Sequence, residues 1–170
     1  MPILLADPRR LGFDTVASFE RAALQRSADA GLLASAGRGL MAIYLYGYSA
    51  EMRVKAAYFR FEFRATGLNS ETTIDQARRN HAVGQFAALG LPKKPGPHDV
   101  SGWAQLLVTK RASRAMRYAP LLERAVVNQA RRLSKRWVET LRYRSNTPYR
   151  HEVRIVREVA EWFEFVYPNL

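Results

Sequence analysis

The side chains best suited to chemistry in this sequence are its arginines, lysines and histidines. Lys and Arg number 27 against 15 Asp and Glu, which gives a formal net charge of +12. Most of the excess follows residue 85, where 16 of the basic residues stand against 7 acidic ones. Such a charge attracts polyanions, of which nucleic acid is the commonest. The alternative is a helical protein whose arginines form surface ion pairs.

Basic residues recur between residues 120 and 141, a stretch whose apolar residues are spaced as in a helix. We expect these residues to bind RNA or another polyanion through its phosphates. Such contacts position the nucleic acid on the protein but do not select a nucleotide sequence. The basic residues on or beside this face, with one further along the chain, are Arg124, Arg131, Arg132, Lys135, Arg136, Arg142 and Arg150.

The histidines do not form a metal-binding pattern. They stand at positions 81, 98 and 151, with no paired spacing. The chain has no cysteine, which excludes disulfides and cysteine-ligated zinc. We therefore expect no metal and no cofactor.

Apolar residues at helical spacing predict an all-α fold, an up-and-down bundle of five to six helices. The clearest stripe is Leu40, Ile43, Gly47, Ala50, Val54, Ala57 and Phe61. Another, expected to start at Pro120, is Leu122, Val126, Gln129, Leu133, Trp137 and Leu141. Residues 14–170 are expected to form the one domain, and residues 1–13 an irregular lead-in.

The boundaries of the remaining elements follow from capping residues, glycines and prolines. A first helix is expected to start after Asp14, its cap, and to run to about Ala30, with a break or weak joint at Gly31 and Gly37. A third helix fits residues 72–89, a loop fits residues 91–97, and a short helix follows His98. For the last helix, Thr147 is the expected cap and Pro148 the first residue.

The last helix carries two apolar stripes, which suggests two packing partners. Its second stripe is Ile155, Val159, Trp162 and Val166. We expect one partner to be the core and the other a second subunit in a homodimer. The longest apolar stretch, residues 40–48, is about half the length of a membrane span, and no basic signal-peptide start is present. A cytoplasmic protein with no membrane segment is therefore predicted.

Three segments resemble HEPN domains. The helix that includes Gly47, Glu51 and Lys55-Ala56 is similar to the family's second helix, with its tyrosine-rich lead. His98-Asp99 opens a short helix, and Trp137 and Arg142-Tyr143 precede the last one, in the family's order. Together these segments span about residues 14–167.

The resemblance implies a helical bundle that is often dimeric, with several functions. Some members are metal-independent endoribonucleases of toxin–antitoxin or defence systems. Others bind RNA or nucleotides, or act with a small nucleotidyltransferase. We expect binding of RNA, a nucleotide or such a protein partner, an antitoxin included, slightly ahead of cleavage. A structural or interaction protein without a nucleic-acid role is the third possibility.

For catalysis the resemblance points to Arg144 and His151. Active members carry an arginine followed, after four to six residues, by a histidine at the start of the last helix, and here six residues intervene. An imidazole can take the proton of the RNA 2′-hydroxyl near neutral pH. A guanidinium can stabilise charge on the phosphate.

Other polar residues have simpler interpretations. Glu51 and Lys55 are expected to be a helix-stabilising pair worth a few tenths of a kcal/mol, with a pocket position for Glu51 as the alternative. His98 is expected to start a helix, and His81 to lie on a solvated face.

Overall fold

The computed structural model describes residues 14–91, 96, 98–138, 140–141 and 148–170. These residues form six α-helices: α1 (Val16–Ser35), α2 (Gly39–Ala65), α3 (Gln76–Ala88), α4 (Val100–Ser113), α5 (Pro120–Ser134) and α6 (Arg150–Val166). A 3-10 helix, η3 (Tyr167–Asn169), follows α6 directly. The predicted all-α bundle is confirmed, whereas the expected lead-in at residues 1–13 lies outside the described residues.

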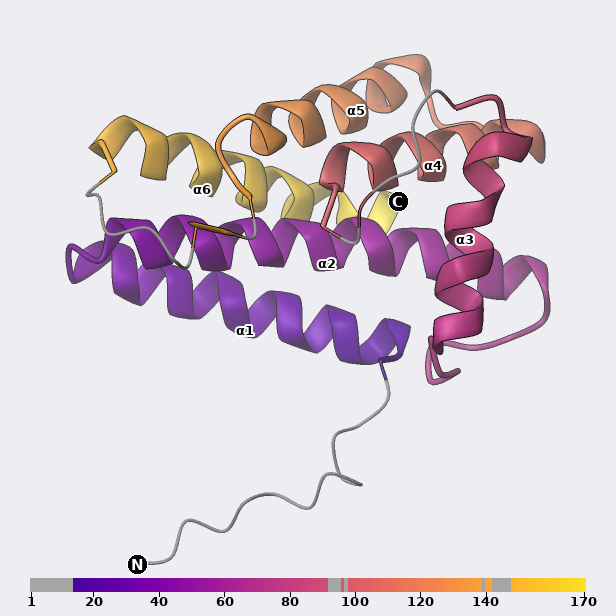
Figure 1. The fold of residues 1–170 in the computed structure, drawn as a ribbon, viewed down its shortest axis with the longest axis horizontal. Helices are drawn as coiled ribbons and strands as arrows, with labels where there is room; N and C mark the ends of the chain where they lie inside the picture. Colours follow the sequence, from indigo (N-terminus) through magenta and orange to yellow (C-terminus); the bar gives the residue numbers. More distant parts are fainter. Residues whose placement is uncertain (1–13, 92–95, 97, 139, 142–147) are drawn as a thin grey trace, which may run out of the picture.

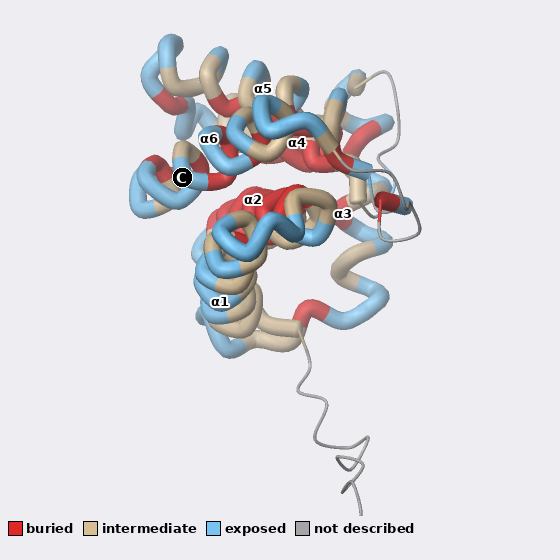
Figure 2. The backbone as a smooth tube through the Cα atoms, turned by 90° about the vertical axis from the view of Figure 1, so that its left-hand side faces the viewer, coloured by how far each residue is buried: buried red, intermediate tan, exposed pale blue. Residues whose placement is uncertain are grey.

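Helices α1, α2, α4, α5 and α6 run roughly along the long axis of the molecule, and α3 stands across α2 (Figure 1). Helix α2 is central, since it packs against α1, α4 and α6. It buries 15 of its 27 residues, because it is apolar on more than one face. Figure 2 shows the buried residues gathered where α2 faces α4, α5 and α6. No helix in the described part of the chain is both long and apolar enough to cross a bilayer.

Buried polar contacts fix α1 and α6 onto α2. The Ser49 hydroxyl donates to the Ala23 carbonyl oxygen of α1 at 2.9 Å. Arg53, only 3% exposed, donates to Ser49 and pairs with Glu164 of α6 at 2.7 Å. Burial lowers the pKa of Arg53, and the nearby Glu164 carboxylate opposes that shift. These contacts fix the positions of α1 and α6 along α2.

The starts of the first helices differ from the predictions by a few residues. Thr15, rather than Asp14, caps α1, through a reciprocal pair of bonds with Ser18. The helix continues through Gly31, and the break comes at Gly37, where φ is +74°. Helix α3 begins only at Gln76, since the Asp75 carboxylate caps it by accepting from the Arg78 N–H at 2.8 Å.

The predicted bounds of α5 and α6 were partly wrong. Pro120 does begin α5, but that helix ends at Ser134, before Trp137 and Leu141. The chain turns there, and the Trp137 ring packs directly on α2. Helix α6 begins at Arg150 with Tyr149 as its cap, so Pro148 is not its first residue. Thr147, the expected cap, lies outside the described residues.

Helix α3 is attached less extensively than the others. Only Ala82 and Phe86 of its residues are buried. Its start is held to the start of α1 by an isolated antiparallel bridge between Thr15 and Thr73. Its two sides border two separate cavities of about 490 and 450 Å³.

The second apolar stripe of α6 is largely covered within one chain. Val159 and Val166 are buried, and Trp162 is half-buried against the core. The stripe therefore does not require a second subunit, and the homodimer stays a prediction.

Candidate functional site

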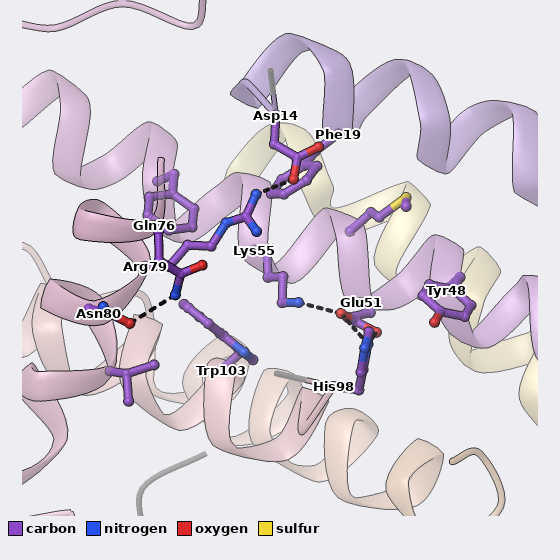
Figure 3. A pocket seen from close by; sticks show the side chains of 13 residues that line it. Asp14, Phe19, Tyr48, Glu51, Lys55, Gln76, Arg79, Asn80, His98 and Trp103 are labelled. Atoms are coloured by element: carbon purple, nitrogen blue, oxygen red, sulfur yellow. Dashed lines mark hydrogen bonds and ion pairs between the residues drawn. The ribbon is translucent and has the colours of Figure 1, made fainter. Parts of the chain in front are cut away.

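The larger cavity lies between α2, α3 and the start of α4 (Figure 3). Its volume of about 490 Å³ is within the range of small-molecule sites. It combines aromatic walls with charged and amide side chains. The lining residues are Asp14, Phe19, Tyr48, Glu51, Met52, Lys55, Phe59, Gln76, Arg79, Asn80, Val83, His98 and Trp103.

Glu51 is the central polar residue of this cavity, and only 3% of its side chain is exposed. The Lys55 ammonium, one helical turn further along α2, donates to Glu51 Oε1. His98 Nδ1 lies 3.2 Å from Oε1 and 3.1 Å from Oε2. Because a carboxylate only accepts hydrogen bonds, this contact makes His98 Nδ1 the donor. The pair predicted to stabilise the helix thus contains a buried carboxylate that lines a cavity, which matches the alternative interpretation of Glu51.

Trp103 of α4 brings an indole N–H to the same region. The residue is 3% exposed, and its ring packs against Tyr58 and Phe59. The Lys55 ammonium lies 5.5 Å from the ring centre. Nε1 is buried and has no hydrogen-bond partner among the described residues. In Figure 3 the indole nitrogen is at the end of the ring nearer Lys55 and His98.

Helix α3 supplies the polar mouth of the cavity. Gln76 and Asn80, one turn apart, are both exposed and joined by a 2.9 Å hydrogen bond. Between them on the same face, Arg79 pairs with Asp14, which lies just before the start of α1. The Arg79 side chain is 41% exposed, so its guanidinium remains within reach of a ligand.

An aromatic cluster closes the far side of the Glu51–His98 contact. The Tyr48 ring packs edge-on against His98 and against Trp137, with centres 5.6 and 5.3 Å away. Trp137 Nε1 donates to the Tyr44 carbonyl oxygen at 3.0 Å. Its ring lies directly on Gly47, where a Cβ atom would be 2.0 Å from Trp137 Cδ1. Gly47 is thus needed for this close approach.

Of the two residues predicted to be catalytic, His151 does not line this cavity. His151 is exposed in the first turn of α6, where its ring stacks on Tyr149 with centres 5.7 Å apart. Pro148 and Val153, on either side of it in sequence, pack beside Gly39. Gly39 is twelve residues before Glu51 on α2, about 18 Å along the helix. Arg144 lies outside the described residues, so its position relative to His151 stays a prediction.

The predicted phosphate-binding residues are only partly available. Arg131 and Lys135 are exposed at the end of α5, and Arg124 is exposed near its start. Arg132 pairs with Glu158 of α6 at 2.9 Å, and Arg136 donates weakly to the Arg132 carbonyl oxygen at 3.5 Å. Arg150 is exposed at the start of α6, and Arg142 is outside the described residues.

None of the residues Glu51, Lys55, His98 and Trp103 was predicted as a site residue, although a pocket position for Glu51 was the alternative. The available signal was the pair of opposite charges on a helix rich in apolar residues, since a charged residue on such a helix is costly to bury without partners. Within the described part of the chain, no three His, Asp or Glu side chains group so as to hold a metal ion.

Comparisons with protein families, with curated proteins and with solved structures found no match to this chain.

Proposed function

We propose that this chain is a HEPN-like helical module that binds a nucleotide, free or within single-stranded RNA, in the Glu51 cavity. One observation carries the proposal: residues from all three segments that resemble the family lie at or beside this cavity in the described part of the chain. Glu51 and Lys55 of α2 and His98 line the cavity, and Trp137 packs behind it through Tyr48. The buried Glu51 carboxylate, held against an ammonium and an imidazole that are 15% and 31% exposed, supports a ligand site.

The chemistry of the walls suits a nucleobase. Unpaired bases are recognised by aromatic contacts together with hydrogen bonds to their edges. Phe19 and Phe59 supply aromatic surface, and Gln76 and Asn80 supply amide groups at the mouth. A cavity of about 490 Å³ has room for a base and part of its ribose.

The charges favour a phosphate position outside the inner end of the cavity. Glu51 with Lys55, and Asp14 with Arg79, are pairs of opposite charge. The inner end thus lacks the excess positive charge that a buried phosphate requires. Arg79 also has an acidic partner, Asp14, but its side chain is 41% exposed against 15% for Lys55, so it is the better phosphate partner.

The test is to fill the cavity. Isothermal titration of wild type with nucleoside monophosphates should show binding, and Val83→Phe should weaken it at least about tenfold because the new ring occupies ligand space. Ala87→Phe is the matched control, since Ala87 is exposed on the same helix and does not line the cavity. Absence of binding by wild type at millimolar nucleotide would contradict the proposal.

A metal-independent endoribonuclease using Arg144 and His151 is the second candidate. The supporting observation is the exposure of His151 in the first helical turn of α6, where backbone N–H groups favour phosphate. His151 would take the proton of the 2′-hydroxyl, whose oxygen attacks the adjacent phosphorus. The 5′-oxygen leaves and is protonated, which yields a 2′,3′-cyclic phosphate and a 5′-hydroxyl.

For this activity we expect RNA cleavage in EDTA that His151→Ala lowers by roughly 10²–10⁴-fold, the contribution of a general base. His81→Ala, which changes another exposed histidine, should leave the rate unchanged. The cleavage rates of wild type and of both variants are measured by product analysis on a defined oligonucleotide. Equal cleavage by wild type and His151→Ala would assign the activity to a contaminant.

A further inference from the structure

A third cavity, of about 230 Å³, lies on the other side of α2 from the Glu51 cavity. Arg60 and Arg64 of α2 line it, and they follow Glu51 and Lys55 by about two and a half helical turns, which turns them to the opposite face. Its volume is below the range of about 300–1,000 Å³ usual for ligand pockets, so it suits a small group rather than a whole nucleotide. The lining residues are Arg60, Phe61, Arg64, Ala65, Arg111, Met116 and Leu170.

The side chains around this cavity carry mostly positive charge. Three of its lining residues are arginines and none is acidic. In the described part of the chain, the only carboxylate side chain within ion-pair distance of these guanidinium groups is Glu20, which lies 3.9 Å from Arg60. The Glu20 carboxylate also accepts a hydrogen bond from the Tyr167 hydroxyl. The arginines therefore keep an excess of positive charge, which the inner end of the Glu51 cavity lacks.

Arg111, in the last turn of α4, is held at the wall of the cavity by two rings and two carbonyl oxygens. Its guanidinium carbon lies 4.0 Å from the centre of the Tyr118 ring and 5.0 Å from that of Phe61. Nε donates to the Met116 carbonyl oxygen at 3.1 Å, and Nη1 donates to the Leu170 carbonyl oxygen at 3.4 Å. These two bonds leave most of the N–H donors of the guanidinium available to an anion.

The Arg60 guanidinium lies close to that of Arg111. Its carbon is 4.3 Å from the centre of the Tyr167 ring, and Nη2 donates to the Tyr167 carbonyl oxygen at 2.8 Å. The same oxygen accepts the Leu170 N–H at 3.0 Å, so the two arginines bind the carbonyl oxygens at either end of one tight turn. Burial raises the pKa of Tyr118 to about 12, and the charges of Arg111 and Arg60 both oppose that rise. Both charges therefore lie near one hydroxyl group.

Arg64 is the arginine of this cavity that is most open to solvent. It follows Arg60 by one helical turn, and its side chain is exposed. It has no ion pair and no side-chain hydrogen bond to any residue that the structure describes. Binding of an anion by Arg64 thus breaks no existing contact within the described part of the chain.

We propose that the Arg60–Arg64–Arg111 cavity binds a phosphate group, either as inorganic phosphate or as a small phosphate monoester. Planar guanidinium groups bind phosphate oxygens through paired hydrogen bonds. Arg60 and Arg111 are positioned before binding, and Arg64 completes the site from the solvent side. Phe61 and Met116 offer apolar surface to the carbon group of an ester. The site is separate from the nucleotide cavity and does not depend on it.

Titration calorimetry with inorganic phosphate at constant ionic strength tests the site. We expect saturable binding to wild type, and an affinity at least about tenfold lower for Arg64→Ala, which loses a charged hydrogen bond to the anion. Arg117→Ala is the matched control, because it removes the same charge from an exposed arginine that does not line the cavity. Its affinity for phosphate should equal that of wild type.

Phenyl phosphate distinguishes the two sources of the phosphate group. Tighter binding of phenyl phosphate than of inorganic phosphate assigns the site to a monoester, because its ring then contacts Phe61 and Met116. Equal or weaker binding assigns the site to free phosphate.

Two results would overturn the proposal. Non-saturable binding, or an equal loss of affinity in Arg64→Ala and Arg117→Ala, would mean that phosphate is attracted only by the overall charge of a basic protein. Val83→Phe, which fills the Glu51 cavity, should leave the phosphate affinity unchanged. Loss of phosphate binding in Val83→Phe but not in Arg64→Ala would place the anion in the Glu51 cavity instead.

Discussion

Gly47→Ala should destabilise the protein by roughly 2–4 kcal/mol, although the same change favours most helices. In a helix interior, alanine is about 1 kcal/mol more favourable than glycine. At Gly47 the added Cβ would lie 2.0 Å from Trp137 Cδ1, which no side-chain pair tolerates. Trp137 is 2% exposed and bonded through Nε1 to Tyr44, so its ring has no free space to occupy. Overpacking of this kind costs about 1–3 kcal/mol, and a lost buried hydrogen bond a similar amount.

Gly84→Ala is the matched control for this prediction. Gly84 is also inside a helix, but it is exposed, and a Cβ there would meet no atom within 4 Å. It should stabilise α3 by about 0.5–1 kcal/mol, so the two substitutions should shift the urea midpoint in opposite directions. A Gly47→Ala variant as stable as wild type would mean that Trp137 does not pack on α2.

Glu51→Ala should lower the free energy of unfolding by about 3 kcal/mol at neutral pH. It removes the carboxylate that satisfies both Lys55 and His98 and leaves the ammonium, 15% exposed, without its counter-charge. Removing one partner of a buried pair typically costs about 3–5 kcal/mol. We expect a cost at the lower end of this range because Lys55 can turn partly toward water.

The control is Glu161→Ala, which breaks the Arg157–Glu161 pair on the surface of α6. That pair has the same four-residue spacing, but its side chains are 57% and 51% exposed. Its loss should cost only about 0.3–0.5 kcal/mol. Urea unfolding of both variants measures the difference. Similar small losses would mean that Glu51 is solvated like any surface carboxylate.

The helices were predictable because apolar spacing and capping residues act locally. The stripe from Leu40 to Phe61 identified α2, and Pro120 identified the start of α5. Ends were less predictable where tertiary contacts decide them. Pro148 packs beside Gly39 instead of starting α6, and α5 stops early because the chain turns to bring Trp137 onto Gly47.

The candidate site was harder to predict because its contacts are distant in sequence. Glu51 and Lys55 have the spacing of an ordinary surface pair. What distinguishes them is burial and His98, 47 residues away. The cavity itself exists because α3 crosses α2 at an angle, and no local pattern in the sequence encodes that crossing (Figure 1).

The sparse attachment of α3 has a kinetic consequence. A helix with two buried residues, bordered by a cavity on either side, costs less to displace than α2, which buries more than half of its length. Because Gln76, Arg79 and Asn80 belong to α3, its displacement widens the mouth without disturbing the Glu51 network on α2. For the nucleotide binding proposed above, we expect the rate of ligand entry to depend on the motion of α3, and the affinity to depend on the fixed groups of α2 beneath it.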